Sequence, residues 1–162
     1  MKTLKTYLHE AEGVKLMLLG GPGSGKSTHA EFISEYFDIP HIYPGDMLRK
    51  SDDPEVKALL AKGEFAPLDV VVKIIKQEIA KAPNGYILDG FPRNLEQLKE
   101  MHDAGIEINR VIYLDVSDAE VIKRLTARGR ADDTPEIVKN RLKVYERETG
   151  PVVDYYKGKK EF

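Results

Sequence analysis

The residues with the clearest chemical signature form a glycine-rich segment, GGPGSGKS, at positions 20–27. The segment fits the pattern G-x-x-x-x-G-K-[ST] and stands between an apolar stretch and a helical one, which is the context that this pattern requires. Such a loop turns its backbone N–H groups around phosphate oxygens, while Lys26 supplies positive charge and the Ser27 hydroxyl can bind Mg²⁺. The segment therefore predicts a binding site for the phosphates of a nucleotide.

A second candidate, Asp89, follows the apolar segment 86–88. Parallel sheets present their ligands at the carboxyl ends of their strands. A carboxylate there can hold Mg²⁺ directly or through a water molecule. A solvated aspartate or a helix cap is the alternative, but the phosphate-binding segment favours a metal site.

Five arginines fall in segments where anions would be bound. The planar guanidinium group binds phosphate oxygens in pairs and stays charged. Transfer of a phosphoryl group between two phosphorylated molecules requires that like charges be neutralised and aligned. A surface ion pair is the simpler interpretation of each arginine alone, whereas the whole set favours a phosphoryl-transfer site. The five are Arg49, Arg93, Arg128, Arg130 and Arg141.

The charged segment 128–134 also contains two carboxylates, Asp132 and Asp133. We predict that it is a mobile lid whose arginines are positioned by these carboxylates. The alternative is the beginning of a helix, with Thr134 or Asp133 as the N-cap and Pro135 in the first turn. The two interpretations are compatible.

The elements that must position these residues alternate along the chain. Residues 45–81 show no strand pattern, and Pro54 and Pro67 can each begin a helix, so this stretch predicts a small helical insertion. Alternating strands and helices imply crossover connections and helices on both faces of the sheet. The predicted fold class is α/β, a three-layer α/β/α arrangement of the P-loop NTPase type with a mainly parallel sheet. Strands are predicted at 14–19, 41–43, 86–88 and 111–116, and helices after residue 25, after residue 94, and at 118–128 and 135–148.

Composition excludes several classes of function. The chain of 162 residues has 25 Lys and Arg against 27 Asp and Glu, a net charge of −2, so it lacks the basic excess that nucleic acid or anionic lipid would require. It contains no Cys, which excludes disulfides, zinc–thiolate sites and cysteine nucleophiles. Its apolar runs fall short of the ~20 residues that cross a bilayer. We therefore expect a soluble, cytoplasmic protein without nucleic-acid or membrane partners.

Four segments together resemble the adenylate kinase family of nucleoside monophosphate kinases. They are GGPGSGKST at 20–28, HIYPGDMLR at 41–49, DGFPRNLEQ at 89–97 and RLTARGRADDTPEIVKNRL at 124–142. The resemblance runs in order from about residue 14 to residue 157. It implies reversible transfer of the γ-phosphoryl group of MgATP to a nucleoside monophosphate, AMP in the first place, with two diphosphates as products.

The resemblance also implies a role for each residue of the motifs. The implied ATP-binding residues are Gly21, Pro22, Gly23, Ser24, Gly25, Lys26, Ser27, Thr28 and Arg128. The implied acceptor-binding residues are Asp46, Arg49, Gly90, Phe91, Pro92, Arg93, Gln97, Arg130 and Arg141, with Gln97 reading the base. The implied catalytic residues are Lys26, Arg93, Arg128, Arg130 and Arg141. Mg²⁺ would be held with ATP by Ser27 and Asp89, and no zinc is expected.

The implied organisation is a single domain, 1–162, which functions as a monomer or a dimer. Its core comprises residues 14–44, 82–127 and 135–162, and its monophosphate-binding insertion comprises residues 45–75. Residues 128–134 form a short lid without the zinc-type module of some relatives, and residues 1–13 form an N-terminal extension.

Two departures from the family pattern concern the chemistry. Ser27 stands where the family usually has Gly, which leaves magnesium binding intact because Ser is the general choice in such loops. Tyr43 and Pro44 replace the usual Ser-Thr, removing a hydroxyl and a backbone N–H near the acceptor base. The identity of the acceptor therefore stays open between AMP and CMP or UMP. Asn94, directly after Arg93, resembles the residue of pyrimidine-preferring relatives, whereas Gln97 favours adenine.

Two further departures concern length. The stretch 49–63 is shorter than the family norm, which predicts a smaller acceptor lid. The sequence stops at Phe162, where relatives usually continue for one more strand and helix. We hypothesise that residues 3–12, a possible amphipathic helix with Leu4 and Leu8 on one side, lie across the sheet edge that this leaves exposed. A frayed tail and a dimer contact are the alternatives.

Other functions also fit the motifs. One is a nucleotide-binding module of the same fold with little turnover, and another is a different P-loop kinase for a small molecule. The retained phosphate-handling residues argue against the first, and the DGFPR segment argues against the second. No essential general base is expected, because a monophosphate oxygen is already an anionic nucleophile. The four histidines show no pattern of partners and are expected to be structural or surface residues.

Overall fold

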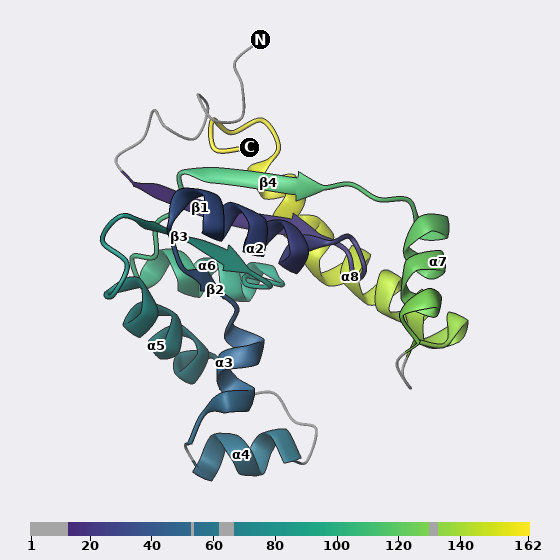
Figure 1. Ribbon diagram of the computed structural model, residues 1–162, viewed down its shortest axis with the longest axis horizontal. Coiled ribbons are helices and arrows are strands. Elements are labelled where there is room, and N and C mark those ends of the chain that lie inside the picture. The colour runs from purple at the N-terminus through teal and green to yellow at the C-terminus, as the bar shows by residue number, and fades with distance from the viewer. Residues whose placement is uncertain (1–12, 53, 62–66, 130–132) are drawn as a thin grey trace.

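A computed structural model describes residues 13–52, 54–61, 67–129 and 133–162 of the chain (Figure 1). Strands and helices alternate as the sequence predicts. The elements are β1 (Val14–Gly20), α2 (Lys26–Phe37), β2 (His41–Ile42), α3 (Pro44–Lys50), α4 (Pro54–Ala61), α5 (Leu68–Ile79), β3 (Gly85–Asp89), α6 (Leu95–Asp103), β4 (Arg110–Leu114), α7 (Asp118–Arg128) and α8 (Pro135–Tyr156).

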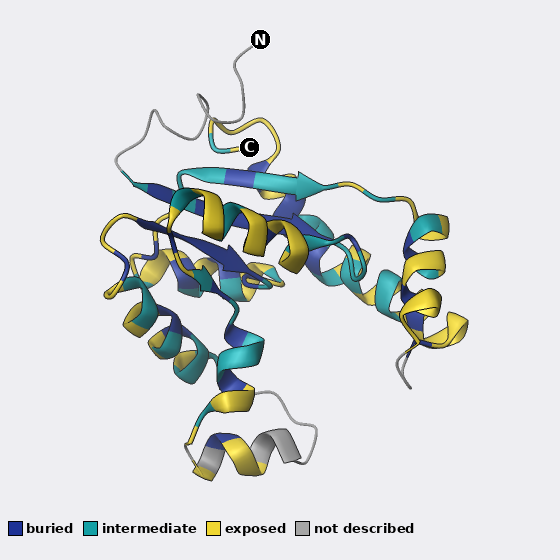
Figure 2. Cartoon of the chain, in the orientation of Figure 1, coloured by how far each residue is buried: buried dark blue, intermediate teal, exposed yellow. Residues whose placement is uncertain are grey.

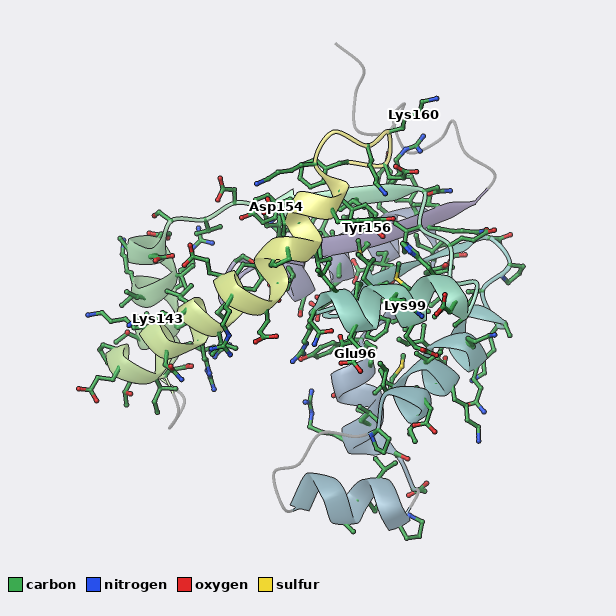
Figure 3. All side chains as sticks on the ribbon, turned by 180° about the vertical axis from the view of Figure 1, so that it is seen from behind. Glu96, Lys99, Lys143, Asp154, Tyr156 and Lys160 are labelled. Atoms are coloured by element: carbon green, nitrogen blue, oxygen red, sulfur yellow. The ribbon has the colours of Figure 1, made fainter. Side chains whose placement is uncertain are left out.

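The described strands form one sheet of four parallel strands in the order β2-β3-β1-β4. Figure 1 shows α2 in front of this sheet and α6 and α8 behind it. Seen from behind, α6 with Glu96 and Lys99 lies beside α8 with Tyr156 (Figure 3). The predicted α/β class, with a parallel sheet between helices, is confirmed.

The two faces of β1 contribute to separate apolar clusters, because successive side chains of a strand point in opposite directions. Leu16 and Leu18 pack with Ala30 of α2 on one face. Met17 and Leu19 belong to the cluster on the other face, with side chains of α5, α6 and α8. Burial on both faces explains why this strand is a nearly continuous apolar run and appears dark blue in Figure 2.

Two strands end earlier than predicted, because their ends depend on the elements that they meet in the fold. β4 ends at Leu114 rather than at residue 116, because its partner β1 ends at Gly20, which is paired with Leu114. β2 ends at Ile42 because Tyr43 already caps α3: its carbonyl accepts hydrogen bonds from the next helical turn.

The helix predicted at 135–148 is longer in the structure, where α8 continues to Tyr156 with Pro151 in its interior. Proline removes one helical hydrogen bond and crowds the preceding turn. Here Val152, Val153 and Tyr156 are buried against the sheet, and their burial offsets that cost.

The stretch predicted as a helical insertion contains α3, α4 and α5, and no strand is found in its described part. Pro44, Pro54 and the residue after Pro67 begin these helices, as prolines at helix starts do. α4 lies farthest from the sheet (Figure 1). The role of residues 45–75 as the acceptor lid stays a prediction.

The hypothesis for residues 3–12 lies outside the described residues and stays a prediction. At the edge that it concerns, the carbonyl of Glu161 accepts a hydrogen bond from the Val111 N–H, and Phe162 stacks on Tyr113 at 6.3 Å between ring centroids. The final residues thus cover the beginning of the outer edge of β4. Among the described residues, no helix is long and apolar enough to span a membrane.

Candidate active site

The phosphate-binding segment connects the carboxyl end of β1 to the first turn of α2, as predicted. At two of its glycines a Cβ would crowd a neighbouring element. Gly20 has a φ of 154°, and a Cβ there would lie 3.0 Å from the carbonyl oxygen of Leu114. Gly23 has a φ of 70°, and a Cβ there would lie 2.8 Å from Cγ of Leu125. The glycines therefore allow the loop to lie directly against β4 and α7.

Lys26 lies at the beginning of α2 and folds back onto the loop. Its Nζ donates hydrogen bonds to the carbonyl oxygens of Gly20 and Gly21, at 2.6 and 2.8 Å. Burial of the ammonium group lowers the pKa of Lys26, although the charge of Asp89 opposes this shift. An ammonium group held in this way is available to phosphate oxygens that approach the loop.

Asp89 ends β3 and is almost completely buried, with 1% of its surface exposed. Its Oδ2 accepts a hydrogen bond of 2.8 Å from the Ser27 hydroxyl and lies 3.1 Å from Nε2 of His41. Burial alone would raise the pKa of Asp89, but the hydrogen bonds from His41 and Ser27 and the charge of Lys26 lower it overall. The carboxylate is therefore ionised at neutral pH.

The oxygen atoms of Ser27 and Asp89 fit Mg²⁺, which prefers hard oxygen ligands and takes few of them from the protein when phosphates supply the rest. No group of three or more His, Cys, Asp or Glu side chains suited to a metal is found in the described part of the chain. The arrangement thus suits a metal ion that arrives with a nucleotide.

His41 is a site residue that sequence reasoning missed, since it was expected to be structural or on the surface. Parallel pairing of β2 with β3 places His41 opposite Ile87, two residues before Asp89. This contact joins segments 48 residues apart. The available signals were its place at the beginning of the predicted strand 41–43 and in the segment HIYPGDMLR, and neither of them pointed to Asp89.

Arg93 is fixed at both its backbone and its side chain. Its Nε donates to the Gly90 carbonyl at 2.9 Å, and its backbone N–H donates to the Gln97 side chain at 2.7 Å. Asn94 caps α6 by accepting a hydrogen bond from the backbone N–H of Gln97 at 2.9 Å. Asn94 thus caps the helix while the Gln97 side chain binds the residue before the cap, and the roles of Asn94 and Gln97 in base selection stay predictions.

Arg49 lies on α3, exposed, with its Nη2 3.6 Å from the carboxylate of Asp46. The same carboxylate binds Lys50 at 2.7 Å, and these partners lower the pKa of Asp46. Asp46, predicted to bind the acceptor, thus contacts the arginine predicted to bind its phosphate.

Asp133 brings two predicted lid arginines together. It accepts two hydrogen bonds from Arg128, at 2.7 and 2.8 Å, and lies 3.4 Å from Nη1 of Arg141. The arginines come from α7 and α8, whereas the Asp133 side chain is 1% exposed. Thr134 is the N-cap of α8, as the helix-start alternative predicts, and the lid role of the segment stays a prediction. Arg130 lies outside the described residues.

The remaining predicted residues lie around these centres. α7 lies against the loop through Leu125 and Gly23, and Arg128 follows on the same helix face, three residues after Leu125. Phe91 is buried in the core beneath the Arg93 turn. The structure therefore gathers Lys26, Ser27 and Asp89 at the carboxyl end of the sheet, with Arg93 nearby. Arg49 lies on α3, and Arg128 and Arg141 from α7 and α8 meet at Asp133.

Comparisons with known proteins agree with this arrangement. The family model described as "Adenylate kinase" matches residues 18–161. The chain is 41% identical over 152 residues to the adenylate kinase of Prochlorococcus marinus strain MIT 9515, covering 88% of this chain and 84% of the relative. It is 40% identical over 156 residues to the adenylate kinase of Mycolicibacterium paratuberculosis, covering 89% and 86%. The chain therefore belongs to the adenylate kinase family.

Proposed function

We propose that this chain is an adenylate kinase that transfers the γ-phosphoryl group of MgATP reversibly to AMP and yields two molecules of ADP. The observation that carries the proposal is the gathering of Lys26, Asp89 and Arg93 at the carboxyl end of the parallel sheet, close enough for their charges to interact. These groups can neutralise phosphates from a donor and an acceptor at one place.

On the donor side, the backbone N–H groups of the loop and Lys26 would bind the phosphates of ATP. Ser27 and Asp89 would hold Mg²⁺, which neutralises charge on those phosphates when it is bound. The lowered pKa of Asp89 supports this role, because only the ionised carboxylate attracts a cation.

On the acceptor side, Arg49 and Arg93 would bind the phosphate of AMP. Within the described part of the chain, no residue bonds the two terminal nitrogens of Arg93, so both can point their N–H groups at an anion. A guanidinium group binds two oxygens of one phosphate at once. The acceptor oxygen is already anionic, so positioning and charge neutralisation are sufficient for transfer.

Arg128, Arg130 and Arg141 would stabilise the charge of the transferring group. Asp133 holds Arg128 and Arg141 in place before the substrates arrive, and so reduces the reorganisation that transfer requires. Closure of the segment 128–134 over the site would exclude water and prevent hydrolysis of ATP.

The test is to mix the protein with MgATP and, separately, AMP, CMP, UMP and GMP, and to quantify the di- and triphosphates by chromatography. We expect ADP from AMP, a loss of at least a hundredfold in turnover for Lys26→Ala, and unchanged turnover for the matched control Lys143→Ala, an exposed lysine on α8 (Figure 3). Preferred turnover of CMP or UMP would make the protein a pyrimidine kinase. Nucleotide binding without transfer would make it a binding module.

Other expectations accompany this proposal and stay predictions. They are a cytoplasmic location, the absence of zinc, and the absence of nucleic-acid and membrane partners. The choice between a monomer and a dimer also stays open.

A further inference from the structure

Tyr43 occupies the acceptor side of the site, where it departs from the family pattern. It follows β2 directly, and its carbonyl accepts hydrogen bonds from the backbone N–H groups of Asp46 and Met47 at 3.1 and 3.2 Å. These bonds fix the backbone of Tyr43 at the point where the sheet meets α3. The backbone from which its side chain projects is therefore fixed by the fold.

The Tyr43 ring lies close to both arginines assigned to the acceptor phosphate. The Cζ atom of Arg49 is 5.6 Å from the ring centroid, within cation–π range. The ring edge also lies near Gly90, where a Cβ would be 3.2 Å from Cε2 of Tyr43 and 3.5 Å from Nη2 of Arg93. His41 stacks on the ring with 6.2 Å between centroids.

The Tyr43 hydroxyl has its hydrogen-bonding capacity free. Among the residues that the structure describes, none forms a hydrogen bond with it. It lies close to the backbone of Gly45, where a Cβ would be 3.5 Å from the hydroxyl oxygen. The side chain is only partly buried, so the hydroxyl can donate to an incoming ligand.

We propose that Tyr43 is an acceptor-binding residue, whose hydroxyl donates a hydrogen bond to the phosphate of the nucleoside monophosphate while its ring holds Arg49 beside the same group. The inference rests on the proposed function, because it adds a residue to the acceptor side of that site. A phosphate has more lone pairs than two guanidinium groups use, and a hydrogen bond to a charged acceptor is about twice as strong as a neutral one.

Because the tyrosine is neutral, it strengthens binding of the acceptor without supplying charge to the transfer step. Its removal therefore acts on KM for the acceptor rather than on kcat. For Tyr43→Phe, which keeps the ring, we expect KM for AMP to rise about tenfold, as loss of a hydrogen bond to a charged group predicts. KM for ATP and kcat should stay within about twofold. Tyr43→Leu, which also removes the ring beneath Arg49, should raise KM for AMP further.

The matched control is Tyr155→Phe, at a partly exposed tyrosine on α8, for which all three constants should stay unchanged.

A second measurement compares the binding of AMP and adenosine to the parent and to Tyr43→Phe by calorimetry. We expect weaker binding of AMP and unchanged binding of adenosine. Equal weakening of both would place the hydroxyl at the base or ribose and overturn the proposal, as would an unchanged KM for AMP. Failure of the parent to transfer phosphate would contradict the proposed function, whereas AMP calorimetry would still decide the role of Tyr43.

Discussion

Arg128 and Asp133 form a two-point ion pair, with N···O distances of 2.8 and 2.7 Å, at the junction of α7 and α8. The carboxylate is 1% exposed and the arginine side chain 39% exposed, so the ion pair compensates for burial of the Asp133 charge. Because Arg141 approaches the same carboxylate, one buried anion positions two arginines that would act on the transferring phosphate.

Asp133→Asn keeps the shape of the side chain and removes its charge. We expect kcat to fall at least tenfold, because both arginines lose the group that orients them. We also expect the free energy of unfolding to fall by about 1.5–3 kcal/mol, the range for hydrogen bonds to charged groups. Steady-state rates and urea unfolding measure the two effects. Asp154→Asn, at an exposed aspartate that pairs with Lys157, is the control and should change neither.

The magnesium site gives a separate prediction. Asp89→Asn should lower turnover at least a hundredfold and raise the Mg²⁺ concentration needed for half-maximal rate, because an amide attracts the cation far less than a carboxylate does. Ser27→Ala should act in the same direction with a smaller effect. Initial rates at fixed ATP and varied Mg²⁺ provide the measurement. An Asp89→Asn variant with the Mg²⁺ dependence of the parent would exclude Asp89 from the metal site.

The parts of the fold that depend on local sequence could be predicted. The glycine pattern, the apolar run before it and the prolines that begin helices each have a local physical cause. The end of β4 could not be predicted, because it depends on where β1 ends at Gly20. The continuation of α8 through Pro151 also could not, because it depends on the burial of Val152 against the sheet.

The candidate site, like the fold, could be predicted only where the cause lies in the local sequence. The loop residues and arginines were identified from motifs, whereas the contact between His41 and Asp89 arises from the register of two strands that are distant in sequence. Asp133 stood beside the arginines in the sequence, but the spacing alone did not show that one carboxylate contacts both Arg128 and Arg141. Register and side-chain direction are therefore the parts that required three-dimensional structure.

The close approach of Gly23 to α7 allows a test of the loop geometry with a matched pair. Gly23 and Gly105 have nearly the same φ, 70° and 69°, but only a Cβ at Gly23 meets neighbouring atoms, at 2.8 Å from Leu125. Gly105→Ala should lower the free energy of unfolding by about 1 kcal/mol, because alanine is strained in a left-handed backbone. Gly23→Ala should lower the free energy of unfolding by about 2–4 kcal/mol, because overpacking against buried Leu125 adds to the cost of the left-handed backbone. Urea unfolding measures both variants, and equal costs would show that α7 does not restrict the loop.

The buried Tyr86 should make the stability of the folded protein depend on pH in the alkaline range. Its ring is buried and its hydroxyl donates to the backbone carbonyl of Glu107. Burial, with the nearby charge of Glu107, raises the pKa of Tyr86 to about 12, above the value of about 10 for an unfolded chain. A group whose folded pKa is raised gives stability that is complete below the unfolded pKa and is lost as pH rises through the folded one.

The unfolding free energy of the parent should therefore fall relative to Tyr86→Phe between about pH 10 and pH 12, by up to about 2 kcal/mol. Urea unfolding at pH 8.5, 10 and 11 measures this difference, with Tyr36→Phe, at a tyrosine 59% exposed, as the control. A constant difference between parent and Tyr86→Phe across this range would mean that the hydroxyl ionises as readily in the folded protein as in the unfolded chain.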